Sequence, residues 1–263
     1  MFKRLRMPLL IGALGLLVAP AVSYTTNADD ICTLRTDNDG NCYADVLDQA
    51  VIVEGIITSW KQFGVRGPGT IVDPTTGCCI AVFDLDTVVD LPTGTLVQVS
   101  GWMGQFSGLD QVTDNPADGA DIVVTVLGDP GAPFCIPISG ADLQDFSAVA
   151  EKVESCLVSL CGRFLAEGNF DAPGSGANFD FLAEDGNIIV VRIDADTDLV
   201  GTPIPQTPVT LCGVSSQFDV FNNNLCQGYQ VFPRSLADIT PSSLCDPVPN
   251  VPTTWGQVKS IMR

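Results

Sequence analysis

Histidine is absent from the 263 residues, and this absence removes several classes of chemistry. Without an imidazole the chain can build neither a Ser-His-Asp triad nor a Cys-His pair. A zinc site with histidine ligands and a covalently attached haem motif ending in histidine are excluded for the same reason. No CxxC spacing occurs either, so metal binding by the ten cysteines is a lesser alternative to disulfide bonds.

Basic side chains are scarce, with 12 Lys and Arg against 31 Asp and Glu. Three of them, Lys3, Arg4 and Arg6, lie in the first six residues. Without that segment the net charge falls from −19 to 9 − 31 = −22. A surface this negative repels phosphate backbones, which disfavours nucleic acid as a partner, and it favours solubility or association with cations.

The longest apolar run is too short to cross a bilayer, which takes about 20 residues. That run, Leu9–Val18, follows the basic start and precedes the small residues Ala21-Val22-Ser23. The order is typical of a cleaved secretory signal peptide over residues 1–23, with an uncleaved anchor as the rival. We therefore expect a secreted, periplasmic or cell-surface protein with no membrane span after signal removal, and an even cysteine count in such a protein favours disulfides.

An internal repeat divides the rest of the chain. Val51–Ile57 matches Val158–Phe164, and Gly77–Thr87 matches Gly186–Thr197. A third match, Val97–Gly101 with Val209–Gly213, shows the offset growing from 107 to 112 residues, as loop insertions produce. The repeat predicts two domains of about 100 residues each.

Each copy has the pattern of β-strands. Apolar residues alternate through 51–57, and turn signals such as Glu184-Asp185-Gly186-Asn187 bound the apolar runs. Gly55 and Gly162 lie mid-strand, where a strand bends sharply to close a small barrel. We expect an all-β fold of two tandem OB-like five-stranded Greek-key barrels with little helix.

Long stretches of the two copies resemble a known family. The stretch VIVEGIITSWKQFGVRGPGTIVDPTTG with LPTGTLVQVSGWMGQFSGLDQV resembles the first OB-fold domain of a tandem pair in secreted bacterial proteins. The second copy, from VVRIDADTDLVGTPIPQTPVTLCGVSSQFD to GYQVFPRSLADI, is similar to its partner. Such pairs are similar to OB modules that accompany extracellular nucleases. The resemblance covers about residues 30–240 and implies a fold more than a function, because one fold carries many kinds of site.

The expected organisation follows from the repeat and the segments around it. A helical turn or two is expected within Asp142–Val153, and the C-terminal tail is either a frayed end or a short docking helix. The expected parts are a signal peptide at 1–23, an N-terminal extension at 24–46, the first OB-like barrel at 47–128, a connector at 129–150, the second OB-like barrel at 151–240, a Pro-rich linker at 241–252 and a helical tail at 253–263.

The cysteines are expected to reinforce the barrels. Cys161 and Cys212 precede matching glycines on strands that are neighbours in an OB barrel, which predicts a cross-strand disulfide between them. A second expected bond joins Cys32 to Cys42 across a short loop. Cys78 and its neighbour on the same strand, Cys79, face opposite ways and should have different partners.

Acidic residues form the candidate metal sites. A solvated loop is one interpretation of the clusters, and calcium is the other. The segment 37–41 also echoes a calcium loop, but Arg35 stands at the first ligand position and Val46 at the twelfth. The clusters that recur in both copies are Asp84, Asp86 and Asp90, matched by Asp194, Asp196 and Asp198.

Nucleic acid is the alternative ligand that the fold suggests, because OB barrels bind single strands with aromatic rings beside basic groups. The loop after the first expected strand carries the candidate ligand-binding residues Trp60, Lys61, Phe63 and Arg66. No nucleophile beside a base, phosphate loop or metal cluster is evident, so we do not expect an enzyme. The sequence predicts a secreted non-catalytic binding or structural module with an unknown extracellular ligand or protein partner; the alternative is an extracellular single-stranded nucleic-acid-binding or nuclease-accessory module.

Overall fold

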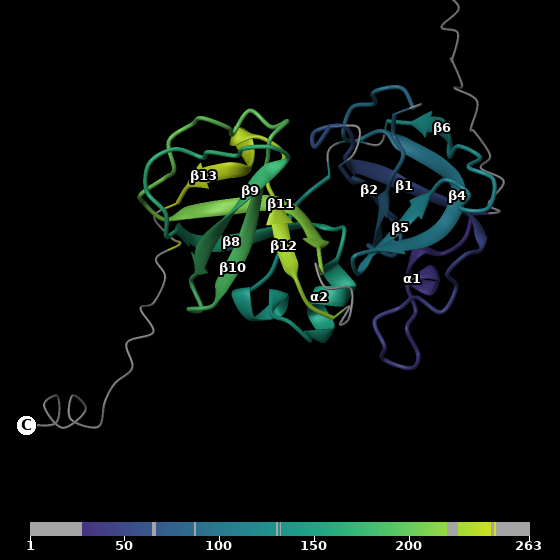
Figure 1. The fold of residues 1–263 in the computed structure, drawn as a ribbon, viewed down its shortest axis with the longest axis horizontal. Coiled ribbons are helices and arrows are strands. Elements are labelled where there is room, and N and C mark those ends of the chain that lie inside the picture. The colour runs from purple at the N-terminus through teal and green to yellow at the C-terminus, as the bar shows by residue number, and fades with distance from the viewer. Residues whose placement is uncertain are drawn as a thin grey trace, which may run out of the picture.

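The computed structural model describes residues 28–64, 67–86, 88–129, 131, 133–219, 226–242 and 245. Two barrels lie side by side, with short helices below the place where they meet (Figure 1). The predicted signal peptide, most of the Pro-rich linker and the C-terminal tail lie outside the described residues.

The first barrel follows a short helix, and the second follows a connector with further helical turns. The elements are α1 Ile31–Leu34, β1 Ala50–Ser59, β2 Gly69–Val72, β3 Cys79–Val82, β4 Leu96–Phe106, β5 Leu109–Thr113, β6 Val123–Gly128, β7 Ile136–Pro137, η1 Gly140–Leu143, α2 Ala148–Val153, β8 Leu157–Phe164, β9 Gly176–Ala183, β10 Ile188–Asp194, β11 Val209–Gln217, β12 Tyr229–Phe232, η2 Leu236–Asp238 and β13 Ile239–Pro241.

The first barrel has the strand order β1-β2-β3-β5-β4 and closes through an additional β1–β4 pairing. All of its pairs are antiparallel except β3 with β5, which is parallel. Strand β6 adds to the outside of β4. Inward residues of β1 alternate with half-buried ones, because successive side chains of a strand point to opposite faces.

The second barrel repeats this pairing with β8-β9-β10-β12-β11, closed by β11–β8, and its one parallel pair within the closed ring is β10–β12. The predicted all-β fold of two OB-like barrels is therefore confirmed. The alignment of the copies also holds in register, since Gly55 pairs with Val97 in the first barrel and Gly162 pairs with Val209 in the second.

Each barrel has its own core. The first is filled mainly by aliphatic side chains around the fully buried ring of Trp60. The second contains a chain of edge-to-face aromatic contacts in which Phe164, Phe170, Phe179 and Phe181 lie with ring centroids 5.0–5.2 Å apart. Burying one phenylalanine ring stabilises a fold by about 1.5–3 kcal/mol, so these rings are a major part of the second core.

All ten cysteines form disulfides, and both predicted pairings are wrong. The bonds are Cys32–Cys78, Cys42–Cys226, Cys79–Cys156, Cys135–Cys212 and Cys161–Cys245.

Strand register explains the first error. Cys161 lies opposite Thr210, while Cys212 lies opposite Ser159, so the two cysteines are two places out of register on β8 and β11. Helix α1 explains the second, because it holds Cys32 against β3, next to Cys78, and leaves Cys42 to reach the second barrel. The prediction that Cys78 and its neighbour have different partners is confirmed.

The connector forms the helical turns expected within Asp142–Val153. Helix α2 begins after Ser147, whose hydroxyl accepts hydrogen bonds from the backbone N–H groups of Val149 and Ala150. None of the described helices has the length and apolar character needed to cross a membrane.

Candidate binding site at the seam between the barrels

The two barrels meet along a surface that we call the seam. The disulfides Cys42–Cys226 and Cys79–Cys156 cross it and connect the first barrel and its N-terminal extension to the second half of the chain. A small apolar cluster also fills it, in which the ring of Phe63 lies 5.3 Å from that of Phe232. Covalent bonds and apolar packing therefore hold the barrels in one arrangement.

Arg35 occupies the middle of the seam, with its side chain 8% exposed. Its Nη1 donates to the backbone carbonyls of Cys79 (3.1 Å) and Glu154 (3.2 Å). Its Nη2 donates to the carbonyl of Glu151 at 2.5 Å and to Glu154 Oε1 at 3.1 Å, and its Nε lies 3.7 Å from Asp110 Oδ2. One guanidinium from the N-terminal extension thus binds groups from the first barrel and from helix α2 and the turn after it.

The carboxyl groups around Arg35 are hard to ionise. Burial raises the pKa of Asp110 from 3.8 to about 6, against the opposing attraction of Arg35. Burial also raises the pKa of Glu154 well above its usual value, and Glu154 Oε2 has no hydrogen-bond partner among the described residues. The pKa of Glu151 is raised by burial too, although the Tyr229 hydroxyl donates a hydrogen bond to it. Asp110, Glu151 and Glu154 thus lie around a single guanidinium, that of Arg35.

A cavity of about 750 Å³ opens beside this network. Arg35, Asp110 and Glu151 are among the polar groups that line it, and helix α2 adds Lys152. Phe146, which is 65% exposed, lines it together with the half-exposed ring of Tyr43. The cavity has the size of a small-molecule site and combines apolar walls with a few fixed polar groups.

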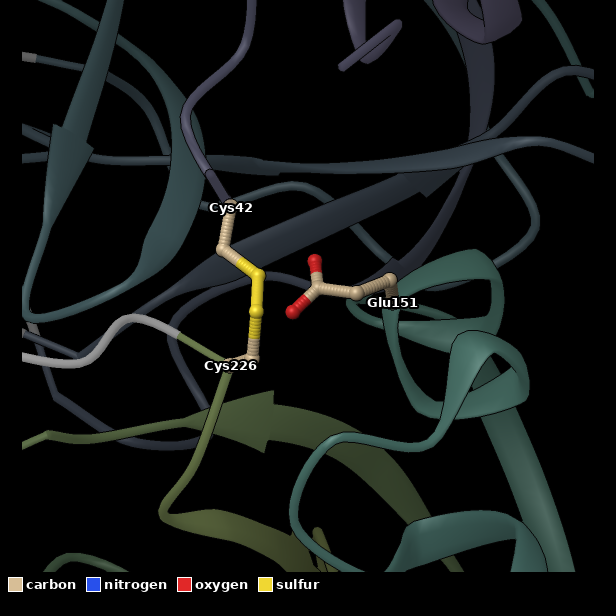
Figure 2. A group of neighbouring side chains, drawn as sticks. All are labelled: Cys42, Glu151 and Cys226. Atoms are coloured by element: carbon tan, nitrogen blue, oxygen red, sulfur yellow. A yellow bond between two sulfur atoms is a disulfide. The ribbon is translucent and has the colours of Figure 1, made fainter. Parts of the chain in front are cut away.

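The Cys42–Cys226 disulfide also lines this cavity. The carboxylate of Glu151 faces it, and the three side chains bring possible metal ligands within 4.8 Å of one another (Figure 2). Because both sulfurs are bonded to each other, neither is the thiolate that a metal ion needs. With the disulfide formed, Cys42 and Cys226 are a covalent link across the seam and do not provide a metal site.

The predicted ligand-binding loop is largely used for folding. Trp60 is fully buried in the first core, and Phe63 is packed in the seam, so neither ring is open to stack on a base. The Lys61 ammonium donates a hydrogen bond to the carbonyl of Val88. Arg66 lies outside the described residues. The structure therefore uses these three side chains in separate folding contacts and does not form the open stacking platform that a single strand would need.

The calcium candidates do not gather into a site. Asp84 accepts hydrogen bonds from the Thr113 hydroxyl and the backbone of Asp114, and Asp194 accepts one from the backbone of Asp196. Neither pair, Asp84 with Asp86 or Asp194 with Asp196, belongs to a cluster of three possible ligands within the described residues.

The loop that echoes a calcium site does form an acidic cluster of Asp37, Asp39 and Asp45. Its carboxylates already accept hydrogen bonds from the loop, for example from the backbone of Cys42 to Asp37 and from the side chain of Asn38 to Asp45. These bonds give the cluster a structural explanation, because they are the contacts of a tight turn.

The seam residues were missed by the sequence analysis. Arg35 was noted only as a mismatch to a calcium loop, and Glu151 and Glu154 lay at the start of the expected second barrel, 151–240. The available signal was a pair of glutamates three residues apart, Glu151 within the expected helical turns and Glu154 just after them, two residues before Cys156. Nothing in the sequence shows that Arg35, more than 100 residues earlier, meets them.

No protein-family model and no curated protein matches the chain. Among solved structures, a chain described as "Structural mimicry for functional antagonism" aligns with 71% of this chain and 89% of its own length, at 12% identity and a TM-score of 0.33. The Ifi202 HINa domain in complex with 20bp dsDNA aligns with 70% of this chain and 94% of its own, at 11% identity and a TM-score of 0.31. At this level of likeness, the assignment of OB-like barrels stands on the strand pairing of the chain itself.

Proposed function

We infer that the protein is a secreted, non-catalytic binding module that takes its ligand in the cavity at the seam. The observation that carries this inference is the cavity of about 750 Å³, lined by fixed polar groups and two aromatic rings. Pre-formed pockets of this size between domains are common ligand sites. Five disulfides support a location outside the reducing cytosol, as does the signal-like first segment.

The free groups of the cavity indicate the ligand's chemistry. Both Nη atoms of Arg35 already donate hydrogen bonds to the protein, and its Nε is buried 3.7 Å from Asp110 Oδ2. Lys152 forms no ion pair within the described part of the chain, so its ammonium is free to bind an acidic group. Phe146 and Tyr43 offer ring faces to an apolar body. The site suits a compact molecule with an aromatic or aliphatic body and one negative group.

Binding is favoured over catalysis by the state of the carboxyl groups. A pKa of about 6 at Asp110 is the kind of value that acid–base catalysis uses. However, one Asp110 oxygen already accepts a hydrogen bond from Gln105, and the other lies beside Arg35. With both oxygens next to protein partners, the Asp110 carboxyl stabilises the seam and is poorly placed to exchange a proton with a substrate.

The test uses 1-anilinonaphthalene-8-sulfonate, a fluorescent probe with an aromatic body and one negative group. We expect saturable binding that weakens about tenfold in Phe146→Ala and in Lys152→Ala, in line with about 1.4 kcal/mol for each lost contact. Phe134→Ala is the matched control, because Phe134 is 81% exposed and does not line the cavity. Equal binding to all four proteins, or no saturable binding, would reject the cavity as the site.

Nucleic acid remains the second candidate, and the OB topology of both barrels favours it. The charge of −19 acts against it. A gel-shift assay with labelled single-stranded oligonucleotides at low salt distinguishes the two. We expect no shift, whereas a shift that disappears in Lys61→Ala would favour the nucleic-acid interpretation.

A further inference from the structure

Strand β6 leaves an open sheet edge on the first barrel. It pairs with β4 along one side, and within the described residues no strand pairs with its other side. Pairing is regular from Val123 to Val126, and a register shift follows only near Gly128. Val123 is 60% exposed and Val126 is 54% exposed. An uncharged edge with unpaired backbone groups is a template for another strand.

The second barrel protects the same topological position. Its outer strand β13 lies against β11 and has three residues, ending at Pro241, which has no N–H to offer. The chain then returns to the barrel, because Ser242 donates to the carbonyl of Pro208 and Cys245 is bonded to Cys161. These are common ways to close an edge, and β6 has none of them over residues 123–126.

The ends of β6 determine which strand fits. The strand itself carries no charge, while exposed acids stand on both sides, Asp118 and Asp121 before it and Asp129 after it. If a second copy of the chain paired with β6 in the antiparallel direction, Asp121 of one copy would lie against Asp129 of the other. In the parallel direction, Asp121 would lie against Asp121 and Asp129 against Asp129, so acidic groups would meet in both cases. Two chains of net charge −19 would also repel each other. A partner strand with Lys or Arg at both ends avoids both the contact between acidic ends and the repulsion between two negative chains.

We propose that β6 binds, by strand addition, an extended segment of another protein that is apolar in its middle and basic at both ends. Backbone hydrogen bonds to residues 123–126 give the affinity, and Asp121 and Asp129 select the charge of the ends. This surface is separate from the seam cavity, since none of its residues lines that cavity. The proposal therefore does not depend on the proposed function.

The test compares two labelled peptides, KKVTVTVKK and EEVTVTVEE, by fluorescence anisotropy at low ionic strength with the full chain. We expect the basic peptide to bind at least about tenfold more tightly, and Val123→Lys to weaken that binding by a similar factor. Ile188→Lys is the matched control, because Ile188 is an exposed strand residue (53%) of the second barrel. Slower amide exchange at residues 123–126 on binding would support the site.

Three results would overturn the proposal. These are equal binding of both peptides, binding of neither peptide, and an unchanged affinity in Val123→Lys. A dimer in sedimentation analysis that Val123→Lys dissociates would instead identify a second copy of the chain as the occupant.

Discussion

The two barrels share a strand pairing and differ in what fills and closes it. The first has an aliphatic core around Trp60, whereas the second packs four phenylalanine rings edge to face. The second barrel ties its strand β8 and strand β11 to flanking segments by Cys161–Cys245 and Cys135–Cys212. The first barrel keeps an open edge at β6 and is tied to its N-terminal helix by Cys32–Cys78.

The difference teaches that backbone pattern and core content are separate requirements. Alternation and well-placed glycines give the barrel topology, and several sets of side chains of the right total volume fill it. Residues that the barrel topology leaves undetermined can then have other roles, such as closing a sheet edge or packing against the other barrel. The seam between the barrels is where such choices have the largest energetic consequence.

The largest expected effect comes from removing the cation that joins the two halves. Arg35→Met should lower the free energy of unfolding by about 3–5 kcal/mol, because Glu154 and Asp110 would remain buried without their partner. Urea unfolding measures it.

Arg234→Met is the matched control for this prediction. Arg234 also crosses the seam, donating to the carbonyl of Thr58 at 2.7 Å, but its ion partner is the single carboxylate of Asp238 and its side chain is 18% exposed. A loss of about 1–2 kcal/mol is expected there. If the two variants lost equal stability, the Arg35 network would not be the main polar link between the barrels.

Acidification should stabilise the protein between neutral pH and about pH 5. The folded pKa of Asp110, about 6, lies above its ordinary value of 3.8, so the folded state binds more protons than the unfolded state in that window. Stability therefore falls as pH rises from 3.8 through 6, by at most about 3 kcal/mol for this group. The raised pKa values of Glu151 and Glu154 act in the same direction. Thermal melts from pH 7 to pH 5 measure the effect.

Asp110→Asn separates the contribution of Asp110 to the pH dependence of stability from the contributions of the other ionisable groups. The variant should lose the part of the pH dependence that Asp110 contributes, because its amide does not titrate, and keep the part that comes from Glu151 and Glu154. Asp37 has the opposite sign: burial acts to raise its pKa, but backbone hydrogen bonds, the largest from Cys42, leave it lowered, so its contribution is lost only below about pH 3.8. A wild-type melting temperature that falls from pH 7 to pH 5 would contradict the prediction.

The fold was predictable because it depends on local, periodic signals. The repeat, the strand alternation and the mid-strand glycines are all visible in the sequence, and the register pairs Gly55 with Val97 as it pairs Gly162 with Val209. The disulfide pairs were not predictable, because they depend on register within a barrel and on where the N-terminal extension packs. A shift of two residues separates Cys161 from Cys212, and the bond goes elsewhere.

The site was less predictable than the fold, since it is made by docking one half of the chain on the other. Trp60 and Phe63 have the residue types of a stacking platform, yet folding buries both. Arg35 meets Glu154 across 119 residues of sequence. Contacts of this kind follow from the arrangement of domains and leave no local pattern.

The last prediction compares the two equivalent glycines of the barrels directly. A Cβ at Gly162 would lie 2.3 Å from the carbonyl oxygen of Leu182 and 2.5 Å from the ring of Phe181, so the backbone or the aromatic core must move. At Gly55 the nearest atoms would be 3.0 Å away, which requires a much smaller shift. Gly162→Ala should therefore cost about 2–3 kcal/mol and Gly55→Ala about 1 kcal/mol or less, measured by urea unfolding. Equal losses would show that the aromatic core of the second barrel yields as easily as the aliphatic core of the first.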